Sequence, residues 1–392
     1  MEDFSDIRPY LPEELPQVYE QLLADPEFEV AVKHVMPDMD MGELAQALSQ
    51  CRTNLEVQKT LFYPLVQMIM MRFANGADMD ASAVSDREHG RYTFVSNHRD
   101  IVLDPAFLSF LLVENGFPTT VEIAIGDNLL IRPWIKHLVR VSKCFIVQRS
   151  LSMRQMLLAS AKMSRYMHYA VNEKGENVWI AQREGRAKDS DDRTQDSILK
   201  MMAMGGEGSV IDRLKHLHIV PMALSYEYDP CDYLKACEFQ LKRDIEGWKK
   251  SQQDDLKNMQ TGIFGRKGHV HFHMAPCIDQ WLDTLPADTP KTEVFTLIAR
   301  HIDEQIHASY RLYPCNLIAM DRLRGTHTEG YTEADVQAFD AYIDAQLEKV
   351  KAEPCVTSGE IVPDWAFMRE RMLTMYANPA INHFKATKNT EQ

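Results

Sequence analysis

The sequence predicts an α/β fold flanked by helical segments. Short runs of β-forming residues alternate with helical patterns between residues 92 and 274, as in domains built on a largely parallel sheet. The chain has 392 residues and is 45% hydrophobic, enough for one large domain with attachments or for two domains. Its 17 glycines and 18 prolines exclude collagen-like and low-complexity classes.

The first part of the chain is expected to be helical. Leucine and valine recur at helical spacing over residues 12–23 and 41–48, and Asp38 or Asp40 can cap the second helix. Residues 74–91 are polar and contain two glycines, which predicts a loop or short hairpin at a domain boundary. We therefore expect an N-terminal helical region over residues 1–75.

The middle of the chain carries the strand pattern. A helix is expected from Pro105 to Glu114, with Asp104 as its cap. Two further helices are expected over 332–350 and 364–377, which gives an α/β domain over 76–325 and a C-terminal helical extension over 326–392. The expected strands are Tyr92–Ser96, Val121–Ile125, Cys144–Val147, Asn177–Ala181, Ile219–Leu224 and His269–Met274.

Charge is distributed unevenly. The 43 lysines and arginines against 57 aspartates and glutamates give a net charge of −14, which argues against nucleic acid as a partner. Residues 130–188 nevertheless carry twelve basic and three acidic side chains, a local charge of +9. This excess indicates either an anionic ligand nearby or ordinary solvated helix faces.

Cysteine usage and hydropathy indicate a cytoplasmic protein. The seven cysteines are scattered without a CxxC pair, as in reduced thiols. The longest apolar run, residues 61–71, is far shorter than the roughly 20 residues of a membrane-spanning helix. The first six residues are acidic and lack the apolar core of a signal peptide.

A histidine directly after a predicted buried strand is the first candidate catalytic group. His98 follows the strand that ends at Ser96, and Asp100 and Asp104 lie shortly downstream. A strand end can expose an imidazole as a general base while a carboxylate orients it. Asp104 could equally serve only as a helix cap.

Three later segments add candidate anion-binding residues. The strand at 145–147 leads to Arg149, the strand at 177–181 leads into Glu184-Gly185-Arg186, and a third strand contains Pro221. Together with the His98 segment, this series resembles the four sequence blocks of the glycerolipid acyltransferase superfamily. The likeness is greatest to glycerol-3-phosphate and dihydroxyacetone-phosphate acyltransferases, followed by lysophosphatidate acyltransferases. It covers residues 92–230 and extends more weakly to about 325.

The sequence departs from the family pattern at two points. Five residues separate His98 from Asp104 where the family has four, so Asp100 competes as the partner of His98. The third block usually has a residue between its glycine and arginine, and Gly185-Arg186 lacks it.

The resemblance implies a central mixed sheet covered by helices and an acyl transfer to a hydroxyl group. His98 would deprotonate the acceptor hydroxyl as it attacks an acyl thioester, with Asp104 or Asp100 orienting the imidazole. Arg149 and Arg186 match positions that bind the acceptor phosphate, and Glu184 and Gly185 match the block that shapes that site. The donor would be acyl-CoA or an acyl carrier protein, with no bound cofactor. The acceptor would be glycerol 3-phosphate or a lysophospholipid, in phospholipid biosynthesis.

Such a product must reach a bilayer, so we expect peripheral attachment to the inner face of the cell membrane. On a helix over residues 129–140, Arg132, Lys136 and Arg140 recur four residues apart beside apolar side chains. This helix could lie on a membrane, dock an acyl carrier protein, or pack on the core with a solvated basic face.

Two other functions compete with the acyltransferase hypothesis. His269, His271 and His273 share one face of a predicted strand and could bind a metal in a hydrolase, although no carboxylate motif accompanies them and we expect no metal site. A non-catalytic lipid-binding or carrier-binding protein of the same fold is the other alternative, and the presence of His98 argues against it.

Overall fold

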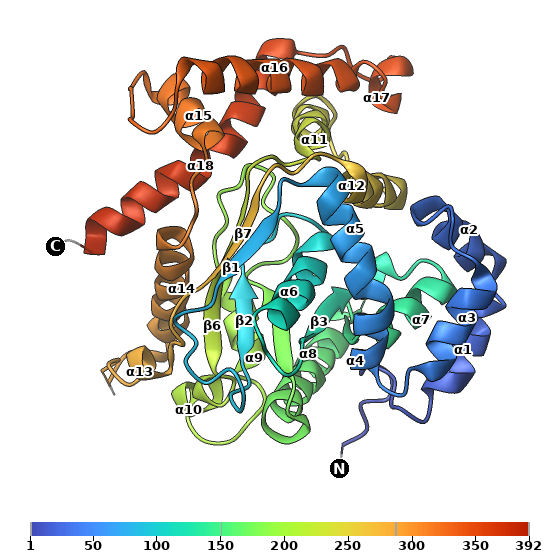
Figure 1. Cartoon of the computed structure of the whole chain (residues 1–392). Helices are drawn as coiled ribbons and strands as arrows, with labels where there is room; N and C mark the ends of the chain where they lie inside the picture. The colour runs from blue at the N-terminus through green and yellow to red at the C-terminus, as the bar shows by residue number, and fades with distance from the viewer. Residues whose placement is uncertain (1, 150, 287, 391–392) are drawn as a thin grey trace.

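A seven-stranded mixed sheet lies at the centre of the protein (Figure 1). The structure is a computed structural model and describes residues 2–149, 151–286 and 288–390. The strand order is β1-β7-β6-β2-β5-β3-β4. The strands are β1 (Ala77–Asp80), β2 (Thr93–Ser96), β3 (Val121–Gly126), β4 (Cys144–Val147), β5 (Asn177–Ala181), β6 (Ile219–Tyr226) and β7 (Val270–Met274).

Strands β2 to β6 are parallel to one another, and β7 pairs antiparallel with β6. The central strand β2 is buried at all four positions, as expected of a strand covered on both faces. On one face lies Phe94 and on the other Val95, each in a different hydrophobic cluster. The predicted α/β fold with a mixed sheet is confirmed.

Helices cover both faces of the sheet. Those before β2 are α1 (Leu15–Leu23), α2 (Pro26–Val35), α3 (Met41–Gln50), α4 (Asn54–Val57) and α5 (Tyr63–Phe73), with a π-helical turn at Gln58–Phe62. Between β2 and β6 lie α6 (Leu103–Glu114), α7 (Pro133–Val141), α8 (Met153–Tyr169), α9 (Asp196–Met202) and α10 (Val210–Lys215), with a 3₁₀ turn at Asp127–Leu129 and a π-helical turn at Ala170–Lys174. After β6 follow α11 (Asp232–Asp244), α12 (Gln252–Phe264), α13 (Asp279–Leu282), α14 (Lys291–Ala308), α15 (Pro314–Arg324), α16 (Glu333–Val350), α17 (Pro354–Thr357) and α18 (Trp365–Thr390).

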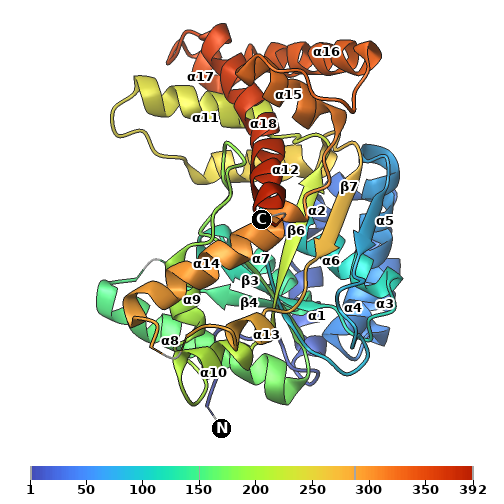
Figure 2. The ribbon, with the colours of Figure 1, turned by 90° about the vertical axis from the view of Figure 1, so that its left-hand side faces the viewer.

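The terminal helices pack against elements from the middle of the chain. Trp134 and Leu138 of α7 join the cluster formed by the N-terminal helices, which also holds Leu15 and Leu44. Helices α11 and α15 form one hydrophobic cluster with α16 and α18, seen at the top of Figures 1 and 2. The domain boundaries at residues 75 and 325 stay predictions.

Most strand boundaries agree with the sequence prediction to within two residues. The polar strand β1 was expected as a loop or hairpin, and that expectation is wrong, because Ala77–Asp80 pairs in parallel with β7 despite its two aspartates. The predicted helix start is also wrong, since α6 begins at Leu103 rather than at Pro105.

Within the described residues, none of the helices has the length and hydropathy that crossing a bilayer requires.

Candidate active site

The carboxyl ends of the parallel strands bring the candidate residues to one edge of the sheet. His98 follows the end of β2, Arg149 follows β4, and Glu184 to Arg186 follow β5. Ligands of open α/β sheets bind outside these strand ends, because side chains from separate loops converge there. His98, Arg149, Glu184, Gly185 and Arg186 all line one cavity at this edge.

The imidazole of His98 is oriented by Asp104. Its Nδ1 lies 2.7 Å from Asp104 Oδ2, and the backbone N–H of Arg99 donates to the same oxygen at 2.6 Å. The Asp104 side chain is fully buried, whereas that of His98 is 14% exposed. Because Nδ1 donates its hydrogen to the carboxylate, the lone pair of Nε2 is available to accept a proton.

Asp100 has a different task from Asp104. Its Oδ1 accepts hydrogen bonds from the backbone N–H groups of Val102 and Leu103 at 2.9 and 2.8 Å, so it caps the start of α6. Burial, reinforced by the neighbouring Asp104 carboxylate, raises the pKa of Asp100. Asp104 lies within the first turn of α6, and its carboxylate contacts His98. The alternative in which Asp104 serves only as a helix cap is therefore wrong.

Two residues that the sequence analysis did not single out hold the end of β2. The side chain of Asn97 makes two hydrogen bonds with the backbone of Leu224 on β6, at 2.9 and 2.8 Å. Trp179 of β5 donates from Nε1 to Ser96 Oγ at 3.0 Å and packs edge-on against the ring of His98. Sequence position alone gives no sign of these contacts between strands.

The cavity beside His98 has a volume of about 1210 Å³, and both basic and apolar side chains line it. The basic side chains come from the β4 and β5 loops. Apolar side chains come from the helices α2, α5, α6, α7 and α12. Residues from these helices that line the cavity include Phe28, Val66, Phe110, Leu138 and Ile263.

Arg149 reaches across the sheet edge to Glu184. Its Nη1 lies 3.6 Å from Glu184 Oε1, and its side chain is 37% exposed. Gly126 at the end of β3 leaves room for this guanidinium, because a Cβ there would lie 2.9 Å from Arg149 Nε. The two predicted residues thus face each other at the rim of the cavity.

Gly185 and Arg186 form the turn that follows β5. Gly185 has a φ of +68°, a left-handed conformation that favours glycine. Arg186 is buried and donates from Nη2 to Asn258 Oδ1 of α12 at 3.0 Å. Its Nη1 has no hydrogen-bond partner among the described residues. Burial alone would lower the pKa of Arg186, but the adjacent Cys231, Asp100 and Asp229 raise it overall, so the side chain stays cationic.

Lys188 is a further basic side chain in the segment that follows β5. It lines the cavity and pairs with Glu238 of α11 at 2.8 Å. Burial, together with the charge of Arg186, lowers the pKa of Lys188 to about 8. Its charge is therefore sensitive to pH near neutrality.

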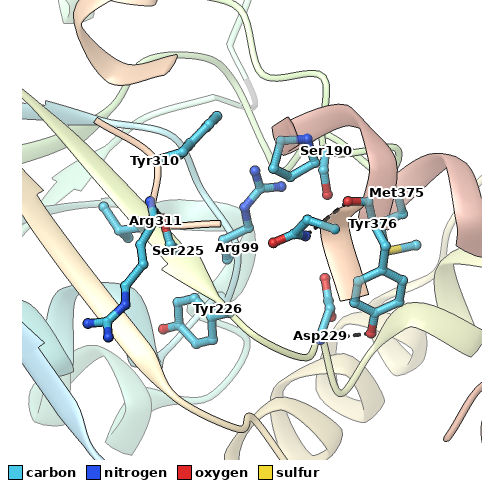
Figure 3. A pocket seen from close by; sticks show the side chains of 12 residues that line it. Arg99, Ser190, Ser225, Tyr226, Asp229, Tyr310, Arg311, Met375 and Tyr376 are labelled. Carbon is cyan, nitrogen blue, oxygen red and sulfur yellow. Dashed lines mark hydrogen bonds between the residues drawn. The ribbon is translucent and has the colours of Figure 1, made fainter. Parts of the chain in front are cut away.

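Arg99 connects the His98 turn to the C-terminal helices. Figure 3 shows its guanidinium in a small cavity of about 30 Å³ that Tyr310 and Tyr376 also line. Its Nη2 lies 3.1 Å from Asp192 Oδ2, in the segment that follows Arg186. Helix α18 holds the same segment, since Asn382 donates to Asp191 Oδ1 at 2.9 Å. The C-terminal helices thereby support both loops of the site.

The basic helix over residues 129–140 differs from its prediction. Arg140 is buried, donates to the backbone oxygens of Arg8 and Ser5 at 2.8 and 2.7 Å, and lies over the ring of Tyr10. The expectation that Arg140 shares an exposed basic face is therefore wrong. Arg132 is exposed and lies 3.5 Å from Glu27, and Lys136 is exposed. A membrane or carrier role for these two residues stays a prediction.

The three histidines of β7 lie opposite the carboxylates of Asp78 and Asp80 on β1. His271 pairs with Asp78 of β1, and His269 Nδ1 lies 3.0 Å from the Tyr313 hydroxyl. His273 faces Asp80 at 3.6 Å. Within the described ranges, the set of three potential ligands whose atoms come within 4.8 Å of one another is His218, Cys277 and Asp279.

The part of the chain that carries this geometry is similar to known proteins. Residues 80–225 match the model of the family described as Acyltransferase. Among solved structures, a crystal structure of the 1-acyl-sn-glycerophosphate (LPA) acyltransferase PlsC from Thermotoga maritima is similar, with a TM-score of 0.37 and 11% sequence identity over 74% of this chain and 96% of that one. No curated protein sequence matches the chain. The segment from residue 80 to residue 225, which holds His98, Asp104, Arg149 and Arg186, is a domain of the acyltransferase family.

Proposed function

We propose that the protein is an O-acyltransferase that moves a fatty acyl group from a thioester to a hydroxyl of glycerol 3-phosphate or a lysophospholipid. The observation that carries this proposal is the His98–Asp104 pair beside one cavity that both basic and apolar side chains line. A general base must lie where donor and acceptor meet. The reaction would belong to phospholipid biosynthesis on the cytoplasmic side of a membrane.

In the proposed reaction, Nε2 of His98 accepts the proton of the acceptor hydroxyl. The acceptor oxygen forms a bond to the thioester carbonyl carbon, and the carbon–sulfur bond then breaks. The proton on His98 passes to the departing thiolate, which leaves as a free thiol. Asp104 keeps the imidazole in the required tautomer and stabilises the transient imidazolium.

The basic lining of the cavity supports a phosphorylated acceptor. Arg149, Arg186 and Lys188 supply cationic groups at its wall. The guanidinium of Arg186 retains an unpartnered N–H, so it can donate a hydrogen bond without losing an existing one. The salt bridge between Arg149 and Glu184 would hold one guanidinium in position at the rim.

The apolar lining of the cavity supports an acyl chain. Each methylene moved from water into such a site contributes about 0.8 kcal/mol, so a long chain binds far more tightly than a short one. Helices α2 and α5 of the N-terminal helical region supply part of this wall. That region therefore completes the acyl site in the proposed enzyme.

The test uses the purified full chain with a radiolabelled palmitoyl thioester, linked either to CoA or to acyl carrier protein. The acceptors are glycerol 3-phosphate, dihydroxyacetone phosphate, lysophosphatidate and unphosphorylated glycerol, and products are identified by mass spectrometry. We expect ester formation with at least one phosphorylated acceptor and with glycerol at a much lower rate. Release of free fatty acid alone, or equal use of glycerol, would contradict the proposal.

A further inference from the structure

The first two turns of α8 carry an exposed apolar patch, formed by Met153, Leu157 and Leu158. The exposed fractions of these side chains are 89%, 62% and 65%. Nine large apolar side chains are exposed in the described part of the chain, and these three, with Met156, account for four of them. Monomeric proteins rarely gather exposed apolar groups in this way unless the patch contacts a partner.

The two halves of α8 have different surroundings. Its second half is anchored, with Tyr166 and Met167 fully buried and Ser164 bonded to the backbone of Met202. In its first half, residues 153–158 are all exposed. Figure 2 shows this half at the edge of the molecule. The exposed first half of α8 therefore projects from the anchored second half, and the patch is not a concave groove.

The patch is continuous with the proposed acyl site. Met156, Ser160 and Met163 of α8 line the cavity, four and three residues apart, so one face of the helix forms a cavity wall. Met156 is itself 45% exposed and lies between the wall and the patch. An acyl chain moving along α8 would pass from the patch to the cavity over apolar side chains.

The charge of this helix also differs from that of the whole chain. Residues 149–172 contain no aspartate or glutamate, in a chain of net charge −14. Arg154 is exposed and makes no ion pair with any described residue. Apolar side chains beside an unpaired arginine complement a bilayer with anionic phosphate groups.

We propose that the first two turns of α8 insert into the surface of an anionic phospholipid bilayer. Met153, Leu157 and Leu158 would lie at the boundary between headgroups and acyl chains, and Arg154 would contact the headgroup phosphates. This inference rests on the proposed function, because it supplies a route for the acyl substrate and the lipid product. It differs from the membrane contact predicted from the sequence, which placed the contact on α7.

The test compares sedimentation of the full chain with sucrose-loaded vesicles of phosphatidylglycerol and phosphatidylethanolamine. The patch variant is Leu157→Glu with Leu158→Glu, and the matched control is Val362→Glu, at a site that is 85% exposed. We expect wild type and the control to sediment and the patch variant to bind roughly a hundredfold more weakly, since burying each leucine favours binding about tenfold or more. Arg154→Glu should weaken binding to these vesicles and leave binding to pure phosphatidylcholine vesicles unchanged.

Activity towards a water-soluble short-chain thioester and glycerol 3-phosphate separates this proposal from the proposed function. The patch variant should keep that activity, because neither leucine lines the cavity. Equal sedimentation of wild type and patch variant would overturn the membrane role, whatever the activity. So would a dimer in size-exclusion chromatography that the patch variant abolishes, or a loss of activity confined to carrier-linked donors with vesicle binding intact.

Discussion

Asp104 accepts hydrogen bonds from the His98 imidazole at 2.7 Å and from the Arg99 backbone at 2.6 Å, through the same oxygen. The second bond fixes the carboxylate to the turn that carries the histidine. The carboxylate and imidazole are therefore positioned by one short segment at the end of β2, before any substrate binds.

The two aspartates near His98 should differ in mutant kinetics. Asp104→Asn should lower kcat by about 10²–10⁴-fold, because the amide cannot stabilise the imidazolium. Asp100→Asn should retain most of the turnover, because an amide oxygen can still accept from Val102 and Leu103. Steady-state kinetics on both variants, with circular dichroism to check folding, would reveal the difference. Equal losses would contradict the assignment of Asp104 as the partner.

The arginines should govern the acceptor more than the donor. Arg186→Ala should raise the KM for the phosphorylated acceptor roughly ten- to hundredfold, since a hydrogen bond to a charged group contributes about 1.5–3 kcal/mol. Arg149→Ala should act in the same direction with a smaller effect, because this side chain is more exposed. The exposed Arg300 supplies the control, Arg300→Ala, which should change neither KM. A rise confined to the KM for the donor would contradict the proposal that Arg149 and Arg186 bind the acceptor phosphate.

The acceptor affinity should depend on pH through Lys188. The pKa of Lys188 is about 8, so its ammonium group is charged at pH 7 and mostly neutral at pH 9. We therefore expect the acceptor KM of the wild type to rise as the pH increases through 8. Lys188→Met should have a raised KM at pH 7 and lack that rise. An unchanged pH profile in the variant would show that Lys188 does not contact the acceptor.

Arg140 should affect stability rather than membrane binding. Arg140→Ala removes two hydrogen bonds to backbone oxygens and should lower the free energy of unfolding by roughly 1.5–3 kcal/mol. Lys136→Ala, on the exposed side of the same helix, should stay within about 0.5 kcal/mol of wild type. Urea unfolding measures both effects. Vesicle binding by the folded Arg140→Ala protein should equal that of wild type, and a selective loss would restore α7 as a membrane contact.

Local sequence patterns predicted the fold class and most strands, because β-forming runs and turn residues act over a few positions. The same patterns failed at β1, whose aspartates are tolerated because they pair with β7 histidines 193 residues away in the chain. They could not distinguish Asp100 from Asp104, since the choice depends on where α6 begins. The environment of Arg140 also depends on a distant segment, residues 5–10. The α8 patch did have a local signal in the sequence, because methionines and leucines recur between residues 153 and 158.

The role of His98 as general base is tested most directly by the rate of acyl transfer by His98→Ala with a phosphorylated acceptor. His216→Ala is the matched control, because this exposed histidine lies outside the cavity. We expect a folded His98→Ala protein whose turnover is reduced by about 10²–10⁴-fold, and a control protein with the rate of wild type. A folded His98→Ala protein that transfers acyl groups at the wild-type rate would contradict this role.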